Sequence, residues 1–283
     1  MPEILYIYAM KQTVKLLEIP DVETAENFNS TADIVIGDQF PASTVLSLYT
    51  NRNVKHIIQK SNLCSETEIK AASTMLLAPQ QFIDFPLSTI FGHENPDQAL
   101  ENSLAQYSFY MSDVDQKTEY LDMLEDYVQQ YASPKSMSLD VRAVADEVIT
   151  NSVFNAPFVD MENSFSGPTR DKGKVMIDPN KKPYSFVGKD TQRFVFGCKD
   201  YYGRLNVRKL IARIQLCYQN NPGQQINYGP GGAGIGSFMI FDSCVSLYVA
   251  VDANKSTTLC CVFPLNMAAR QRHLVPKNLH IYF

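Results

Sequence analysis

The alternation of apolar and polar positions divides the 283-residue chain into three segments. The first segment, residues 1–92, contains three short apolar runs, EILYIY, ADIVIG and VKHIIQ, with helical or mixed stretches between them. Short apolar runs bounded by polar residues are typical of buried strands. Their alternation with helices predicts a small α/β domain with a parallel sheet.

The second segment, residues 96–132, is polar with a helical spacing of its apolar residues. These residues recur at steps of three and four, at Leu100, Leu104, Tyr107, Met111 and Val114, and the rhythm resumes from Leu121 to Tyr131. The spacing is similar to a heptad seam, which predicts a connecting helix or helical hairpin. Two interpretations are open. The connector could pack on its own domain, or two copies of the protein could form a homodimer through residues 97–132.

The third segment, residues 137–283, mixes helical and strand patterns. It predicts a helix over 140–155 with Ser138 as its N-cap, followed by a strand over RFVFGCKD. A polar helical region then leads to a glycine-rich loop, which opens a helix at SFMIFDSCV. Two further strands, SLYVAVD and TTLCCVF, follow that helix.

Composition narrows the classes of function. The net charge of −5 and the pI near 5.4 disfavour a broad nucleic-acid surface, which needs clustered lysine and arginine. We expect no membrane span, because no apolar run reaches 18 residues, and the N-terminus lacks a signal-peptide pattern. The six cysteines form no C-x-x-C pair and several lie in apolar runs, which indicates reduced thiols in a cytoplasmic protein.

The predicted helix carries a polar stripe that could bind a cation. Glu147, Asn151 and Asn155 are spaced i, i+4, i+8 and therefore lie near one helix face, although asparagine is a mediocre helix former. One interpretation is a solvated face. The other is a carboxylate beside an amide oxygen that holds a hydrated Mg²⁺, a cation that prefers oxygen ligands.

The strand RFVFGCKD ends in Asp200, and Gly203 permits a sharp turn after it. A buried carboxylate at this place could accept a hydrogen bond from an exocyclic amino group such as that of adenine. The alternative is an aspartate that only stabilises the turn.

The glycine-rich loop packs five glycines into the eight residues 229–236. It contains the literal G-x-G-x-x-G of dinucleotide-binding proteins, yet the residues before it, NNPGQQIN, are not a buried strand. A phosphate-binding loop of the Walker type would require a lysine before Ser237, where Gly236 stands. A third interpretation is a flap whose free N–H groups surround phosphate oxygens.

Taken in order, these motifs resemble the GHKL (Bergerat-fold) ATPases, the superfamily of gyrase, heat-shock chaperones, histidine kinases and repair proteins of the MutL type. The matching parts are Glu147-x-x-x-Asn151, Asp200-x-x-Gly203, the 232–236 glycines and KSTTLCCVF, within residues 135–265. The stretch ADEVITNSVFNAP is similar to histidine kinases and anti-sigma-factor serine kinases. The resemblance implies a C-terminal α/β sandwich, a mixed sheet covered on one face by helices.

The resemblance also implies a role for each residue. Glu147 would polarise the attacking nucleophile, and Asn151 would ligate Mg²⁺. Asp200 would bind the adenine amino group, supported by Thr257 through a water, and Gly203 would make room for the base. The remaining ATP-binding positions are the flap glycines Gly232, Gly234 and Gly236, together with Asn155. DYYGRL departs from the family pattern, because it lacks the second glycine of the usual D-x-G-x-G.

Residues 1–92 are similar to a shortened receiver domain of two-component signalling. ADIVIGDQFP places Asp38 where receivers have their phosphorylated aspartate, whereas Ala78 replaces the receiver lysine. Without that lysine and an acidic pair, phosphoryl transfer to Asp38 would lack electrostatic stabilisation. We interpret the segment as a degenerate receiver-like domain used for contacts, with a working phosphoacceptor as the alternative.

The resemblance implies an ATP- and Mg²⁺-dependent signalling kinase that phosphorylates a partner protein in trans. Such a kinase would be similar to histidine kinases or to anti-sigma-factor serine kinases. Residues 97–132 contain no histidine, and Pro96 follows His93 one residue too early for the usual phosphoacceptor motif. An alternative is a module in which bound ATP switches a protein contact with little or no chemistry. A dinucleotide oxidoreductase is a third hypothesis, supported by the literal fingerprint alone.

Overall fold

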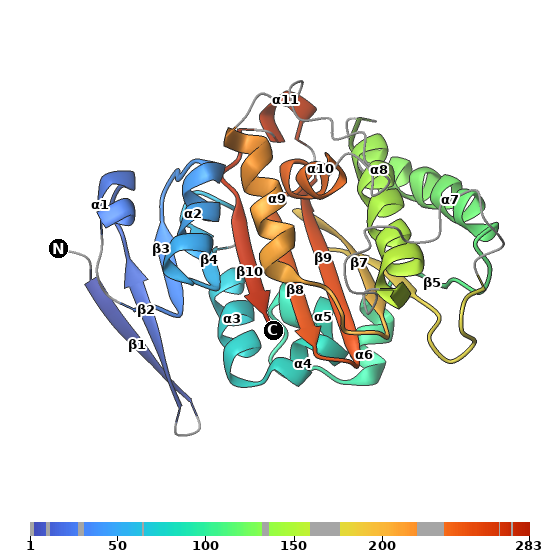
Figure 1. Cartoon of the computed structure of the whole chain (residues 1–283), viewed down its shortest axis with the longest axis horizontal. Helices are drawn as coiled ribbons and strands as arrows, with labels where there is room; N and C mark the ends of the chain where they lie inside the picture. Colours follow the sequence, from blue (N-terminus) through green and yellow to red (C-terminus); the bar gives the residue numbers. More distant parts are fainter. Residues whose placement is uncertain are drawn as a thin grey trace.

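The computed structural model describes residues 3–9, 12–27, 31–63, 65–131, 136–158, 176–219, 235–265, 267–272 and 274–283. Its strands form one ten-stranded mixed sheet in the order β1-β2-β3-β4-β10-β8-β9-β7-β6-β5 (Figure 1). The strands are β1 Glu3–Ala9, β2 Gln12–Glu18, β3 Ile34–Gly37, β4 His56–Gln59, β5 Tyr107–Tyr110, β6 Tyr184–Lys189, β7 Arg193–Asp200, β8 Ser246–Asp252, β9 Ser256–Pro264 and β10 Asn278–Tyr282.

The helices occupy both faces of this sheet. They are α1 Val22–Asn27, α2 Ala42–Arg52, α3 Ser65–Leu77, α4 Pro79–Asp84, α5 Pro86–Phe91, α6 Gln98–Leu104, α7 Gln116–Tyr131, α8 Ser136–Thr150, α9 Val207–Gln219, α10 Ile235–Ser243 and α11 Ala269–Arg272. A π-turn, η1 Asn151–Asn155, and a 3₁₀ turn, η2 Ala156–Phe158, extend α8. The predicted mixed α/β sandwich is therefore confirmed.

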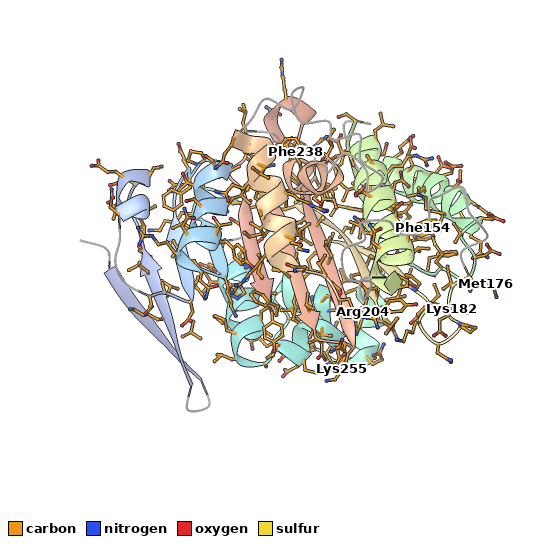
Figure 2. The ribbon with its side chains drawn as sticks, in the orientation of Figure 1. Phe154, Met176, Lys182, Arg204, Phe238 and Lys255 are labelled. Atoms are coloured by element: carbon orange, nitrogen blue, oxygen red, sulfur yellow. The ribbon has the colours of Figure 1, made fainter. Side chains whose placement is uncertain are left out.

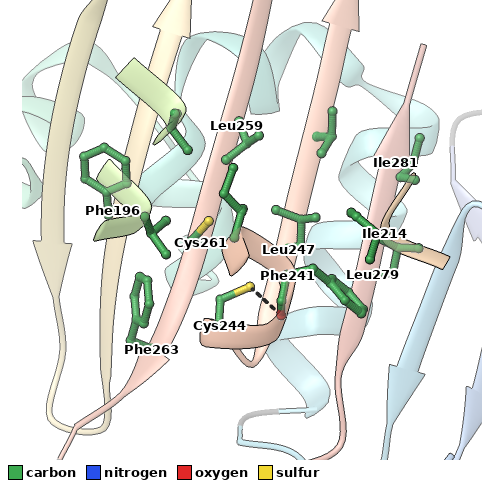
Figure 3. Close-up of a cluster of buried hydrophobic side chains, with 14 of the residues drawn as sticks. Phe196, Ile214, Phe241, Cys244, Leu247, Leu259, Cys261, Phe263, Leu279 and Ile281 are labelled. Atoms are coloured by element: carbon green, nitrogen blue, oxygen red, sulfur yellow. Dashed lines mark hydrogen bonds between the residues drawn. The ribbon is translucent and has the colours of Figure 1, made fainter. Parts of the chain in front are cut away.

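Two buried clusters lie on opposite faces of the sheet, because neighbouring residues of a strand point to opposite sides. One cluster joins the sheet to α2, α7, α8, α9 and α10. Figure 3 shows part of it, with Ile214 of α9 beside Leu279 and Phe241 of α10 near Leu247. The other joins Tyr248, Cys260 and neighbouring residues to α3, α4 and α5. The expectation of one covered face is thus wrong, since helices from residues 65–91 cover the second face.

Residues 1–92 contribute strands to the same sheet as residues 137–283. β3 and β4 pair parallel, as predicted, and β2 pairs parallel with β3. β1 pairs antiparallel to β2, so the prediction of a parallel sheet is wrong for this strand. The pattern did not predict β2. β4 pairs antiparallel with β10, so His56 lies directly opposite His280. This pairing links the beginning of the chain to its last described strand.

The connector differs from the predicted helical seam, because β5 separates α6 from α7. The sequence of β5, Tyr-Ser-Phe-Tyr, alternates half-buried and exposed side chains, and aromatic residues favour strands. β5 pairs antiparallel with β6. The heptad-like spacing of Tyr107 and Met111 is therefore coincidental, since Tyr107 lies in this strand and Met111 follows it.

The predicted helix over 140–155 begins earlier and ends differently. α8 starts at Ser136, so Ser138 is a buried residue inside the helix and not its N-cap. The last predicted turn is the π-turn Asn151–Asn155. The strands over residues 193–200, 246–252 and 256–264 and the helix beginning at Ile235 agree with the predicted elements.

A polar network is buried where β4 meets β10. Glu68 of α3 accepts hydrogen bonds from Ser246 Oγ at 2.8 Å and from the Tyr248 hydroxyl, and its Oε2 lies 2.7 Å from His280 Nε2. His280 Nδ1 lies 3.3 Å from His56 Nδ1, and the Tyr248 and His280 rings stack with centroids 4.3 Å apart. The network therefore ties α3 and β4 to β8 and β10.

We expect the stability of the protein to fall on acidification because of His56. Burial, the neighbouring His280 and Lys55 hold the pKa of His56 well below its ordinary value. The unfolded chain then binds the proton more readily, so stability is lost as pH falls below about 6.5, by at most about 1.4 kcal/mol per pH unit. Urea unfolding between pH 7.5 and 5.5 should show the free energy of unfolding falling with pH, and His56→Asn should reduce this dependence. An unchanged pH dependence in His56→Asn would mean that His56 is not its cause.

Candidate functional site

Asp200 ends β7 as a buried carboxylate in a turn. Its side chain is 6% exposed, and its Oδ1 accepts from the backbone N–H groups of Tyr202 at 2.8 Å and Gly203 at 3.2 Å. Burial raises the pKa of Asp200, against the opposing effect of these hydrogen bonds. Asp200 is therefore a fixed acceptor at the end of a central strand.

Thr257 of β9 is the cross-strand partner of Asp200. Its hydroxyl and its backbone amide both act to lower the Asp200 pKa, so they face the carboxylate. The hydroxyl oxygen is buried, and within the described part of the chain no partner lies at the distance and angle of a hydrogen bond. The structure thus brings these two predicted residues together.

Gly203 packs the turn after Asp200 against the hairpin between β8 and β9. Its φ of +61° is a conformation that residues with a Cβ rarely adopt. A Cβ at this position would lie 2.1 Å from Asp252 O and 2.8 Å from Asn254 N, and Asn254 N donates to Gly203 O at 3.1 Å. A glycine is thus required by the backbone, which is a reason distinct from the predicted space for a base.

The predicted polar stripe forms a hydrogen-bonded chain at the end of α8. Asn151 Nδ2 donates to Glu147 Oε1 at 3.1 Å, and Asn155 Nδ2 donates to Asn151 Oδ1. Glu147 and Asn151 are half-buried, whereas Asn155 is exposed. Asn151 begins the π-turn, a feature found frequently at functional sites.

Two contacts bring the end of α8 against the end of β7. Ser152 Oγ lies 3.5 Å from Cys198 Sγ, and Arg204 NH1 donates to Pro157 O at 3.0 Å. The first contact joins the residue after Asn151 to the strand that ends in Asp200, and the second joins the following turn to η2. Figure 2 shows Arg204 and Lys255 at the same end of the sheet.

The helix that follows the glycine-rich loop contacts the polar stripe. A Cβ on Gly236, the second residue of α10, would lie 2.0 Å from Glu147 Cδ and 2.1 Å from Glu147 Oε1. Gly236 and Glu147 are therefore in close contact. Gly232 and Gly234 lie outside the described residues.

Some residues that build this site were not predicted from the sequence. Ser152 and Cys198 form the link between α8 and β7, and Lys117 of α7 donates to Thr150 Oγ1 at 2.8 Å and pairs with Asp146. The available signal for Cys198 was its place two residues before Asp200 on the same face of β7. No sequence signal marked Lys117.

The receiver-like positions lie elsewhere in the fold. Asp38 follows β3 and is exposed, and its Oδ1 accepts from the Ser61 backbone N–H at 3.1 Å. Ala78 is the N-cap of α4. A hollow of about 310 Å³ on α1 and α2, lined by residues such as Thr44 and Arg52, shares no residue with the site around Asp200.

Neither family models nor curated proteins match the chain. Among solved structures, one chain of the crystal structure of the SiaB-SiaC complex from Pseudomonas aeruginosa is similar at 15% identity and a TM-score of 0.40. The match covers 59% of this chain and 94% of that chain. A similarity at this TM-score supports no conclusion about function. Across the described ranges, no helix has the length and apolar character to cross a bilayer, and no three His, Cys, Asp or Glu side chains form a metal-binding group.

Proposed function

We propose that the protein is an ATP- and Mg²⁺-binding signalling protein of the GHKL class, which phosphorylates a partner protein in trans. The observation that carries this proposal is the meeting of two predicted motifs at one end of the sheet. The contacts Ser152–Cys198 and Arg204–Pro157 hold the Glu147–Asn151 stripe against the Asp200 turn. Residues far apart in sequence, each predicted for a different part of ATP, thus adjoin.

The residues present fit a purine nucleotide. Asp200 is a buried acceptor held by backbone N–H groups, and the Thr257 hydroxyl beside it is buried without a full hydrogen bond among the described residues. An exocyclic amino group would find a charged acceptor in Asp200, and a ring nitrogen or a water would satisfy Thr257. Guanine offers a carbonyl at the equivalent position, so Asp200 favours adenine.

The polar stripe fits the phosphate end of the nucleotide. Asn151 Oδ1 is an oxygen ligand of the kind that Mg²⁺ accepts, and Asn155 holds that amide through a hydrogen bond. Bound Mg²⁺ would supply positive charge to neutralise the phosphate oxygens. Glu147, one helical turn before Asn151, would accept the proton of the attacking hydroxyl or imidazole, or orient that group.

Incubation of the protein with γ-labelled ATP tests the proposed function. Label transferred to a co-purified protein supports a kinase acting in trans. ATP that stays bound and intact, and changes the partner's affinity, supports the alternative of an ATP-dependent switch. Failure to bind ATP in the presence of Mg²⁺ overturns both.

Asp200→Asn is expected to weaken ATP binding by about 10- to 150-fold, because a hydrogen bond to a charged group contributes about 1.5–3 kcal/mol. The asparagine oxygen can still accept from the backbone N–H groups of Tyr202 and Gly203, so the turn should persist. Isothermal titration with ATP and GTP measures the effect, with Asp126→Ala on the exposed face of α7 as a control. Unchanged affinity, or an equal loss in both variants, would remove Asp200 from the site.

A further inference from the structure

Gly236 lies against the carboxylate of Glu147 at a distance that leaves no room for any side chain. The three atoms nearest to a Cβ built on Gly236 are Glu147 Cδ at 2.0 Å, Oε1 at 2.1 Å and Oε2 at 2.4 Å. All three distances are below the closest approach of real Cβ atoms. The whole carboxylate of Glu147 therefore occupies the space that an alanine at position 236 would need.

The backbone does not explain a glycine at this position. The described glycines with positive φ are Gly92 and Gly203, so Gly236 has a conformation that any residue can adopt. It lies within α10, where glycine is less favourable than alanine because it loses more backbone freedom. The missing Cβ instead leaves space for one side chain on another helix, the carboxylate of Glu147.

We propose that Gly236 is a positioning residue for Glu147: its missing Cβ admits the carboxylate and sets it beside Asn151. This inference rests on the proposed function for the role of Glu147 as a proton acceptor, but the steric contact stands on the geometry alone. Glu147 Oε1 accepts from Asn151 Nδ2 at 3.1 Å in this position. A side chain at 236 would push the carboxylate away from Asn151 and from the proposed Mg²⁺ site.

The contact also couples two elements that the proposed function uses. Gly236 belongs to the helix that follows the glycine-rich loop, whereas Glu147 belongs to the helix that carries Asn151. A shift of the first turn of α10 toward α8 would displace the carboxylate, and a shift away would release it. The position of α10 thus determines where the proposed proton acceptor lies.

A thermal double-mutant cycle tests the contact without any nucleotide. Because the clash falls on the flexible end of Glu147, Gly236→Ala should fold and lower Tm by about 2–6 °C as that side chain is displaced. In a Glu147→Ala background the obstacle is gone, so the same substitution should raise Tm by about 1–2 °C, since alanine is the better helix former. In a Glu147→Gln background, which keeps the size and removes the charge, Gly236→Ala should lower Tm again.

A matched glycine on the other face of the sheet serves as the control. A Cβ on Gly197 would meet the Phe186 ring at 2.3 Å and Cys260 Sγ at 3.0 Å. Both groups belong to the buried cluster that packs on α3, α4 and α5, whereas the buried hydrophobic residues of α8 belong to the other cluster. Gly197→Ala should therefore lower Tm equally in the wild-type and Glu147→Ala backgrounds. Equal effects of Gly236→Ala in the wild-type and Glu147→Ala backgrounds would overturn the steric contact.

Turnover separates this inference from the proposed function. At saturating ATP, Gly236→Ala should lose about 10²–10⁴-fold in phosphoryl transfer, as expected for a misplaced general base, and match Glu147→Ala. Wild-type turnover in Gly236→Ala would overturn the positioning role while leaving the kinase intact. A wild-type protein that binds no ATP would overturn the proposed function and the base role together, and the Tm cycle would then decide the contact by itself.

Discussion

Replacing Glu68 by alanine is expected to lower the free energy of unfolding by about 3–5 kcal/mol, the cost of removing one partner from a buried charged network. Glu68 is 1% exposed, and it accepts from Ser246 and Tyr248 and contacts His280. Burial alone would raise the pKa of Glu68, but His280, Tyr248 and Ser246 together lower it. Without the carboxylate, the Tyr248 hydroxyl and His280 Nε2 would lose this partner inside the sheet, and Ser246 Oγ would keep its hydrogen bond from Asn278 Nδ2.

Urea unfolding followed by circular dichroism measures this loss, and Glu66→Ala is the matched control. Glu66 lies on the same helix and is exposed, so its substitution should cost less than about 0.5 kcal/mol. Glu68→Gln should fall between the two, because an amide keeps an acceptor oxygen but loses the charge. A Glu68→Ala protein as stable as Glu66→Ala would mean that the network does not hold α3 and β4 to β8 and β10.

Several elements of the third segment could be predicted because their sequence patterns are local, whereas β6 and β10 were not predicted. β7, β8 and β9 are apolar runs bounded by Asp200, Asp252 and Pro264, and their bounds follow from those polar or ring-constrained residues. β5 could not be predicted in the same way. Its three aromatic residues lie within a spacing that also fits a helix, and only pairing with β6 decides in favour of a strand.

The joining of residues 1–92 to the third segment could not be predicted, because it depends on pairing between distant parts of the chain. His56 and His280 are 224 positions apart, and each is an isolated histidine in the sequence. Their polarity gave no sign that both would be buried, since that burial is made possible by Glu68 on a third element. β9 is buried along its whole length, as expected for a strand covered by helices on both faces, and its apolar run TTLCCVF is consistent with this burial.

The candidate site was predicted as separate motifs, and the structure shows how they adjoin. The order of the motifs along the chain does not say how far apart they lie in the folded protein. The contacts Ser152–Cys198 and Arg204–Pro157 therefore had no counterpart in the sequence analysis. The register that sets Thr257 opposite Asp200 depends on the β8–β9 hairpin. ATP, Mg²⁺ and phosphoryl transfer stay predictions until the nucleotide experiments are done.

Gly203→Ala is expected to lower the free energy of unfolding by about 2–5 kcal/mol, since a positive φ costs about 1–2 kcal/mol for alanine and overpacking costs about 1–3 kcal/mol more. At Gly203 the obstacles are backbone atoms: Asp252 O at 2.1 Å, Lys255 N at 2.7 Å and Asn254 N at 2.8 Å. A side chain could rotate away from a new methyl group, whereas the β8–β9 turn can yield only by moving its backbone.

Gly92→Ala isolates the cost of the backbone contact from that of the positive φ. Gly92 also has a positive φ, +81°, but its Cβ would meet the Thr67 Cγ2 methyl at 3.0 Å. Gly92→Ala should therefore cost only about 1–2 kcal/mol in urea unfolding. Displacing the Gly203 turn also moves the N–H groups that hold Asp200, so ATP affinity should fall in Gly203→Ala and stay unchanged in Gly92→Ala. Equal unfolding costs at the two glycines would show that the β8–β9 turn yields freely, and it would then no longer fix the position of Asp200.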